Sequence, residues 1–101
     1  MGYHLMIETD TKSGKPAREA IIDAAGGRLA LLSPAFSFHQ TESYLLATVY
    51  VERDQLGEAT KYGVSSVLEV FKDLGEPLSL RRVAAYTEAE FDRVHVRGKL
   101  P

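Results

Sequence analysis

The apolar residues of this sequence repeat with two different periods, and the order of these periods limits the folds that the chain can adopt. Residues 44–53 alternate between two sets of side chains, which is the pattern of a β-strand. In residues 55–74, apolar residues recur at i, i+3 and i+4, which predicts an amphipathic helix. Because segments of the two kinds follow one another along the chain, we expect an α+β domain.

The same patterns predict the order of all the elements. Strands are expected at residues 3–8, 28–39, 44–53 and 78–86, and helices at residues 16–25, 55–74 and 87–94. The order β-α-β-β-α-β, followed by a short C-terminal helix, is that of the split βαβ or ferredoxin-like fold. Right-handed crossovers place both long helices on one face of a four-stranded antiparallel sheet. Residues 1–101 suffice for one domain, and we expect residues 95–101 to be a flexible tail.

Residue types at the ends of the elements support these boundaries. Pro16 suits the first turn of a helix, and Gly26-Gly27 is expected to end that helix. Asp54 is expected to cap the long helix, and residues 87–90 (TEAE) form a capping box. Pro34 interrupts the second strand, which is therefore expected at an edge of the sheet.

The composition excludes several classes of function. The chain has no cysteine, which rules out disulfides, zinc–thiolate sites, iron–sulfur clusters and thiol nucleophiles. We expect no metal and no other cofactor, and a reducing compartment, the cytoplasm. A net charge of −2 provides no basic field for nucleic acid. No apolar run approaches the roughly 20 residues of a membrane span, and the N-terminus lacks the features of a signal peptide.

The helices can cover only one face of the predicted sheet, so the opposite face is expected to carry the functional surface. If the strictly apolar set of each strand faces the helices, the open face is aromatic and amphipathic. The residues that we assign to this open face are His4, Met6, Phe38, Tyr44, Leu46 and Tyr50. Beyond Pro34 the sequence does not fix whether Phe36 and Phe38 or Ser37 and His39 point outwards.

Two interpretations of this face are compatible with each other. A monomer seldom leaves such a patch bare, which favours a homodimer that packs sheet against sheet. A ligand pocket framed by His4, Phe38, Tyr44 and Tyr50, within one subunit or between two, is the sharper interpretation.

The remaining polar motifs have ordinary structural explanations. His39 lies near Glu42 in a predicted turn, and a His–carboxylate pair can act as a general base, but a surface loop has the same composition. Residues 11–15 (TKSGK) lack the spacing of a phosphate-binding loop, and Pro16 replaces its hydroxyl residue. The basic residues of the C-terminal tail, Arg93, His95, Arg97 and Lys99, are expected to solubilise the terminus.

Three segments resemble a group of small actinobacterial domains of uncharacterised function. The segments are residues 46–52 (LATVYVE), 57–74 and 80–93 (LRRVAAYTEAEFDR). In that group, a ferredoxin-like module ends in a V-x-x-x-T-E-A-E turn and often precedes a helix-turn-helix segment. Here no helix-turn-helix follows Arg93, so the resemblance implies the module alone and implies neither DNA binding nor a catalytic residue.

Three functional hypotheses follow from the sequence. The first is a non-catalytic binding or regulatory module that acts as a homodimer through the open face and takes a small-molecule ligand or a partner protein. The second is a small cofactor-free enzyme of the dimeric α+β barrel type, with His4, His39, Tyr44 and Tyr50 as candidate polar groups. The third is an interaction or inhibitor domain that adds a partner strand at the edge formed by residues 28–39.

Overall fold

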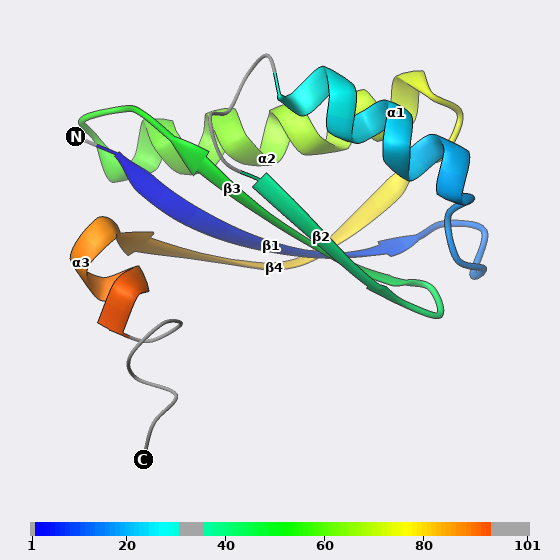
Figure 1. The fold of residues 1–101 in the computed structure, drawn as a ribbon, viewed down its shortest axis with the longest axis horizontal. Helices are drawn as coiled ribbons and strands as arrows, with labels where there is room; N and C mark the ends of the chain where they lie inside the picture. The colour runs from blue at the N-terminus through cyan, green and yellow to red at the C-terminus, as the bar shows by residue number, and fades with distance from the viewer. Residues whose placement is uncertain (1, 31–35, 94–101) are drawn as a thin grey trace.

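The computed structural model describes residues 2–30 and 36–93, and their elements follow the predicted order (Figure 1). They are β1 (Tyr3–Thr11), α1 (Glu19–Leu29), β2 (Phe36–Thr41), β3 (Tyr44–Val51), α2 (Leu56–Asp73), β4 (Leu78–Thr87) and α3 (Glu88–Phe91). This β-α-β-β-α-β-α order is that of a ferredoxin-like split βαβ fold, which confirms the predicted fold class.

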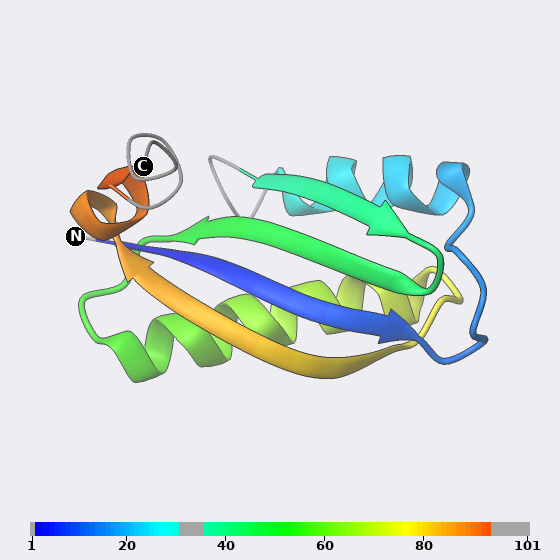
Figure 2. The ribbon, with the colours of Figure 1, turned by 90° about the horizontal axis from the view of Figure 1, so that it is seen from below.

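The four strands form one sheet in the order β2-β3-β1-β4, and every neighbouring pair is antiparallel. The helices α1 and α2 lie side by side on one face of this sheet (Figure 1). The view from below shows the other face, which neither long helix covers (Figure 2). The short helix α3 lies on the open side, at the end of the sheet where β1 begins and β4 ends.

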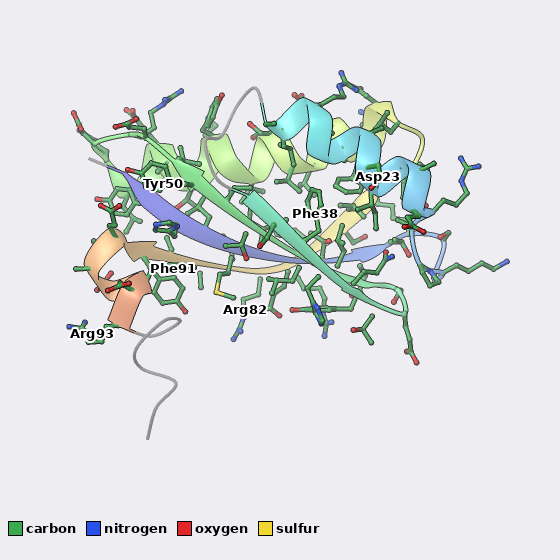
Figure 3. All side chains as sticks on the ribbon, in the orientation of Figure 1. Asp23, Phe38, Tyr50, Arg82, Phe91 and Arg93 are labelled. Carbon is green, nitrogen blue, oxygen red and sulfur yellow. The ribbon has the colours of Figure 1, made fainter. Side chains whose placement is uncertain are left out.

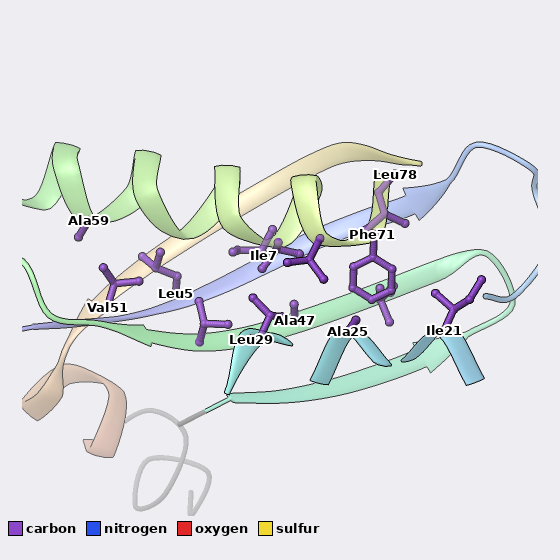
Figure 4. Packing of buried hydrophobic residues seen from close by; sticks show 14 residues of the cluster. Leu5, Ile7, Ile21, Ala25, Leu29, Ala47, Val51, Ala59, Phe71 and Leu78 are labelled. Atoms are coloured by element: carbon purple, nitrogen blue, oxygen red, sulfur yellow. The ribbon is translucent and has the colours of Figure 1, made fainter. Parts of the chain in front are cut away.

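The core lies between the sheet and the two long helices, and it is built from the alternation that the sequence shows. In β1 and β3, every second side chain is buried, as a strand with one covered face requires. The helices meet these strands with an apolar stripe (Figure 4). The main buried residues are Leu5, Ile7, Leu45, Ala47, Val49 and Val51 of the sheet, Ile21, Ala25 and Leu29 of α1, and Ala59, Val67, Val70 and Phe71 of α2.

The first helix differs from its predicted boundaries at both ends. Its first residue is Glu19, so Pro16 lies before the helix, in the exposed loop. The helix continues through Gly26-Gly27 to Leu29, because burial of Leu29 outweighs the helix-weakening effect of the two glycines. Residues 28 and 29 are therefore helical and not part of a strand. The predicted break at Pro34 lies outside the described residues.

The first strand is longer than predicted, because the hydroxyl groups of two buried threonines form hydrogen bonds with backbone carbonyls inside the fold. Thr9 and Thr11 are buried. The hydroxyl of Thr9 donates to the carbonyl of Leu45 at 2.9 Å, and that of Thr11 donates to the carbonyl of Lys15 at 2.6 Å. A buried hydroxyl with such a partner carries little penalty, so the strand runs on to Thr11.

Of the two helix caps predicted from the sequence, that of α2 is wrong and that of α3 is confirmed. Asp54 does not cap α2, because Gln55 occupies the N-cap position and makes no side-chain capping bond. The capping box of α3 is confirmed: the N–H of Thr87 donates to the Glu90 carboxylate at 2.9 Å, and the N–H of Glu90 donates to the Thr87 hydroxyl at 3.2 Å. Val94, the predicted end of this helix, is outside the described residues. Within residues 2–30 and 36–93, no helix is long and apolar enough to cross a membrane.

Gly63 allows α2 to lie close to the sheet. A Cβ atom at this position would overlap Cδ1 of Leu5 and lie 3.2 Å from Cγ2 of Val51. An alanine here would therefore have to displace the side chain of Leu5, which is fully buried in the core. We expect Gly63→Ala to lower the free energy of unfolding by about 1–3 kcal/mol through overpacking, although alanine favours a helix by about 1 kcal/mol.

Gly57→Ala is the matched control for this substitution in the same helix. A Cβ atom at Gly57 has no neighbour within 4 Å, so this variant is expected to be neutral or slightly stabilising. Urea denaturation of both variants measures the difference. Equal losses of stability would mean that the close approach at Gly63 is not the cause.

Candidate functional site

The open face of the sheet consists of rows of side chains that run across the strands. Residues directly opposite one another on neighbouring strands have Cβ atoms about 5 Å apart, so each row forms a continuous surface. From the α3 end to the far end, the rows are Tyr50–His4–Tyr86, Thr48–Met6–Ala84, Leu46–Glu8–Arg82 and Tyr44–Asp10–Ser79. The edge strand β2 adds Ser37, His39 and Thr41 to the last three rows.

The α3 end of the open face is an aromatic cluster. The imidazole of His4 stacks on the ring of Phe91, with centroids 4.2 Å apart and an interplanar angle of 12°. Tyr50 lies on the neighbouring strand β3, and its ring centroid is 4.9 Å from that of His4. The rings of Tyr86 and Phe91 meet edge-on, with centroids 6.2 Å apart. Phe91 points from α3 towards this part of the sheet (Figure 3). The cluster therefore attaches α3 to the open face.

Burial in this cluster shifts two pKa values. The pKa of His4 is lowered chiefly because burial disfavours the charged imidazolium, although the carboxylate of Glu88 acts in the opposite direction. The pKa of the Tyr50 hydroxyl is raised by burial first, and then by the negative charges of Glu52 and Glu88. Both shifts favour the neutral form of the side chain.

The far end of the open face is charged, and its charges are paired within the chain. Arg82 donates through Nε to the Glu8 carboxylate at 2.8 Å, and Arg81 lies 3.3 Å from the Asp10 carboxylate. The guanidinium of Arg81 also lies 5.4 Å from the centre of the Tyr44 ring. The pKa of the Tyr44 hydroxyl is raised, first by burial and then by the Glu8 carboxylate. This end presents two acidic and two basic side chains with no net charge.

A hollow surrounds the first turn of α3 at the edge of the aromatic cluster. One part of it is lined by His4, Glu88, Ala89, Phe91 and Asp92, and an adjoining part by Gly2, Tyr50, Thr87, Glu88 and Ala89. Glu88 and Ala89 line both parts.

The structure places five of the six predicted open-face residues on that face. His4 and Tyr50 lie together at the α3 end, and Met6, Leu46 and Tyr44 follow towards the charged end. Phe38 is the exception, because its predicted position on the open face is wrong. It pairs with the buried Ala47, packs against the core, and meets Phe71 edge-on at 5.6 Å on the helix side of the sheet (Figure 3). Its strand register, which the sequence left open, decides this placement.

The sequence analysis did not assign Arg82, Ala84, Tyr86 and Phe91 to this face. The alternation of Arg82, Ala84 and Tyr86 along residues 78–86 was available as a signal for the first three. Nothing in the local sequence indicates that Phe91 folds back onto β1, because that contact depends on the direction in which α3 leaves the sheet.

The candidate catalytic groups do not converge on one site. His4 and Tyr50 are in the first row, whereas His39 pairs with Leu46 two rows away and Tyr44 lies in the last row. His39 lies on β2 and not, as predicted from the sequence, in a turn with Glu42. Its Nε2 atom lies 3.5 Å from the hydroxyl of Thr41, two residues further along the same strand. Among the residues that the structure describes, no three His, Asp or Glu side chains are grouped to hold a metal ion.

The capping box at Thr87 holds α3 in place, so its loss is expected to loosen the aromatic cluster. Thr87→Ala removes the acceptor for the Glu90 N–H, at a cost of about 1 kcal/mol. We expect faster amide exchange at residues 88–91 and a change in the ring resonances of His4. Thr60→Ala is the control, because the Thr60 hydroxyl only donates back to the carbonyl of Leu56 within α2. Unchanged exchange in α3 would show that the box does not fix this helix.

No family of proteins, no curated protein and no solved structure matches this chain. The function is therefore inferred from the chemistry of the open face and the hollow beside it.

Proposed function

We propose that this protein is a non-catalytic binding or regulatory module that acts as a homodimer, in which two copies bury the open faces of their sheets against each other. The observation that carries the proposal is the composition of the uncovered face. Its middle rows present Met6, Leu46 and Ala84, which are only half-buried in the single chain. Partly exposed apolar side chains gathered on one sheet face are typical of an interaction surface.

The charges at the far end of the face favour a second copy of the chain as the occupant. A two-fold dimer brings the same surface of both copies together, so unpaired charges of one sign would repel each other. Here Glu8 is already paired with Arg82, and Asp10 with Arg81. The face is thus locally neutral and can meet its own copy without like-charge repulsion.

The two alternative functions have less support. An enzyme of the dimeric α+β barrel type needs polar groups that converge, and His39 and Tyr44 lie away from His4. Strand addition needs a free edge. The structure places β2 at an edge of the sheet, as predicted, but Gln40 near its end is tied to Ala17, whose N–H donates to the Gln40 side-chain carbonyl at 2.8 Å. This contact places the 15–18 segment beside part of that edge.

Sedimentation equilibrium of the unmodified protein tests the proposal. We expect a mass of two chains over micromolar concentrations and a melting temperature that rises with protein concentration, because association stabilises the folded state by mass action. A mass of one chain at millimolar concentration would refute the homodimer.

A further inference from the structure

We infer that the charged end of the open face binds α3 of a second copy, so that the two α3 helices lie at opposite ends of the dimer. The charged end is the part of the face that carries the pairs Glu8–Arg82 and Asp10–Arg81. The inference rests on the homodimer proposed above, and it specifies which segment of the partner covers this end.

The position of α3 makes the two ends of the open face different in shape. The stacking of Phe91 on His4 holds α3 on the open side, where β1 begins. Among the described residues, no helix lies over the charged end (Figure 2). A helix with its side chains is about 10 Å across, which is also the usual separation of two packed sheets. One α3 helix therefore fills the space between two sheets at its end.

Two directions of a two-fold axis can pack these faces against each other. In the aligned arrangement the axis runs along the strands, so both α3 helices lie at one end and the two charged ends face each other with no helix between them. In the reversed arrangement the axis runs across the strands, so each α3 lies over the charged end of the other copy. Only the reversed arrangement places one helix at each end, which keeps the two sheets evenly separated along their length.

The charge of α3 also favours the reversed arrangement. Residues 88–93 contain three carboxylates and one guanidinium, namely those of Glu88, Glu90, Asp92 and Arg93. The pKa of Glu90 is lowered, first by its hydrogen bond with the backbone of Thr87 and then by that with the Thr87 side chain, which favours the charged form. In the aligned arrangement two such acidic segments meet at one end, where like charges repel each other.

The charged end presents its positive groups outwards, although its net charge is zero. In one ion pair, the side chain of Arg82 is 73% exposed and that of Glu8 is 20% exposed. In the other pair, the values are 52% for Arg81 and 35% for Asp10. Each carboxylate is thus more covered than its guanidinium, so a partner that approaches this end meets positive charge first. The acidic α3 of the second copy is complementary to this surface.

Distances between spin labels on the two copies test the arrangement, and a chain without cysteine needs only one introduced cysteine per label. Glu52 follows β3 at the α3 end, and Lys12 follows β1 at the charged end; both are exposed. We expect about 30 Å or more between two Glu52→Cys labels, because a nine-residue strand spans about 30 Å. Between Glu52→Cys on one copy and Lys12→Cys on the other, we expect less than about 20 Å, since packed sheets lie about 10 Å apart.

The outcomes of this measurement separate the arrangement from the dimer itself. A short distance between two Glu52→Cys labels in a dimeric protein would overturn the reversed arrangement and leave the homodimer intact. No distance between chains, together with a mass of one chain, would refute the homodimer and the inference with it. The distances are expected to vanish in Met6→Lys, which places a charge in the middle of the open face. If they persist there, the copies meet through another surface and the inference fails.

Glu88→Arg and Glu58→Arg test the contribution of charge. Both glutamates are exposed and lie in the first turn of a helix, but Glu58 belongs to α2 on the other side of the sheet. We expect the dimer dissociation constant to rise about tenfold in Glu88→Arg, because the change acts at two symmetry-related contacts, and to stay unchanged in Glu58→Arg. In 1 M NaCl, where screening acts within about 3 Å, the difference is expected to disappear. Equal constants at low salt, or a difference that persists at high salt, would overturn the contact between α3 and the arginines.

Discussion

Phe71→Ala is expected to lower the free energy of unfolding by about 3–5 kcal/mol, a large effect for a single truncation. Among the residues that the structure describes, Phe71 is the largest fully buried side chain, and it projects from α2 into the core (Figure 4). Its ring also meets Phe38 of β2 edge-on at 5.6 Å. The substitution therefore leaves a cavity between the helix layer and the edge strand β2.

The size of this loss matters because domains of this length have little stability to spare. At roughly 0.05–0.15 kcal/mol per residue, a chain of 101 residues has on the order of 5–15 kcal/mol in total. Urea denaturation followed by circular dichroism measures the change. Leu56→Ala is the control, since Leu56 lies on the same helix but is 50% exposed, and we expect it to cost less than 0.5 kcal/mol. A loss below 1 kcal/mol in Phe71→Ala would contradict the packing described here.

The sequence predicts the fold because β1, β3 and α2 each show one clear period of apolar residues. The alternation in β1 and β3 specifies which residues share a face, and it places Leu5 and Val49 in the core and Met6 and Tyr50 outside it. The helical stripe of α2 is equally clear, with Ala59 buried as predicted. Local propensity fails where burial acts against it, as in the helix that continues through Gly26-Gly27.

The candidate site is predicted less completely, because it depends on registers and directions that are not local properties. Phe38 changes face with a shift of one residue in β2, and no turn signal after Pro34 fixes that register. The pairing of β1 with β4 shifts between Glu8 and Thr9, which brings Arg81 to Asp10 and Arg82 to Glu8. The hollow lies where α3 turns onto the open face and Phe91 stacks on His4, a residue distant in sequence.

Met6→Lys is expected to convert the proposed homodimer into a monomer. Met6 lies on the inner strand β1, between Thr48 and Ala84, in the middle of the open face. In a single chain the new ammonium reaches solvent, so the fold tolerates it. In a two-fold dimer, the two lysines are buried in the same interface. Burial of an unpaired charge costs several kcal/mol, so we expect the dissociation constant to rise at least about a thousandfold.

Ser65→Lys is the matched control, because it adds the same charge on an exposed position of α2, on the helix-covered side of the sheet. This variant is expected to remain dimeric. Leu46→Lys provides a second substitution on the open face, next to Glu8 on the neighbouring strand. Sedimentation equilibrium of the three variants measures the mass, and circular dichroism verifies that each is folded.

The concentration dependence of the melting temperature separates loss of the dimer from damage to the fold. A dimer melts at a higher temperature as its concentration rises, whereas a folded monomer does not. We therefore expect this dependence in the unmodified protein and in Ser65→Lys, and its absence in Met6→Lys and Leu46→Lys. If both open-face variants stay dimeric, the two copies meet elsewhere, and β2 and β4 become the candidate contacts, since they are the edge strands of the sheet in the described part of the chain.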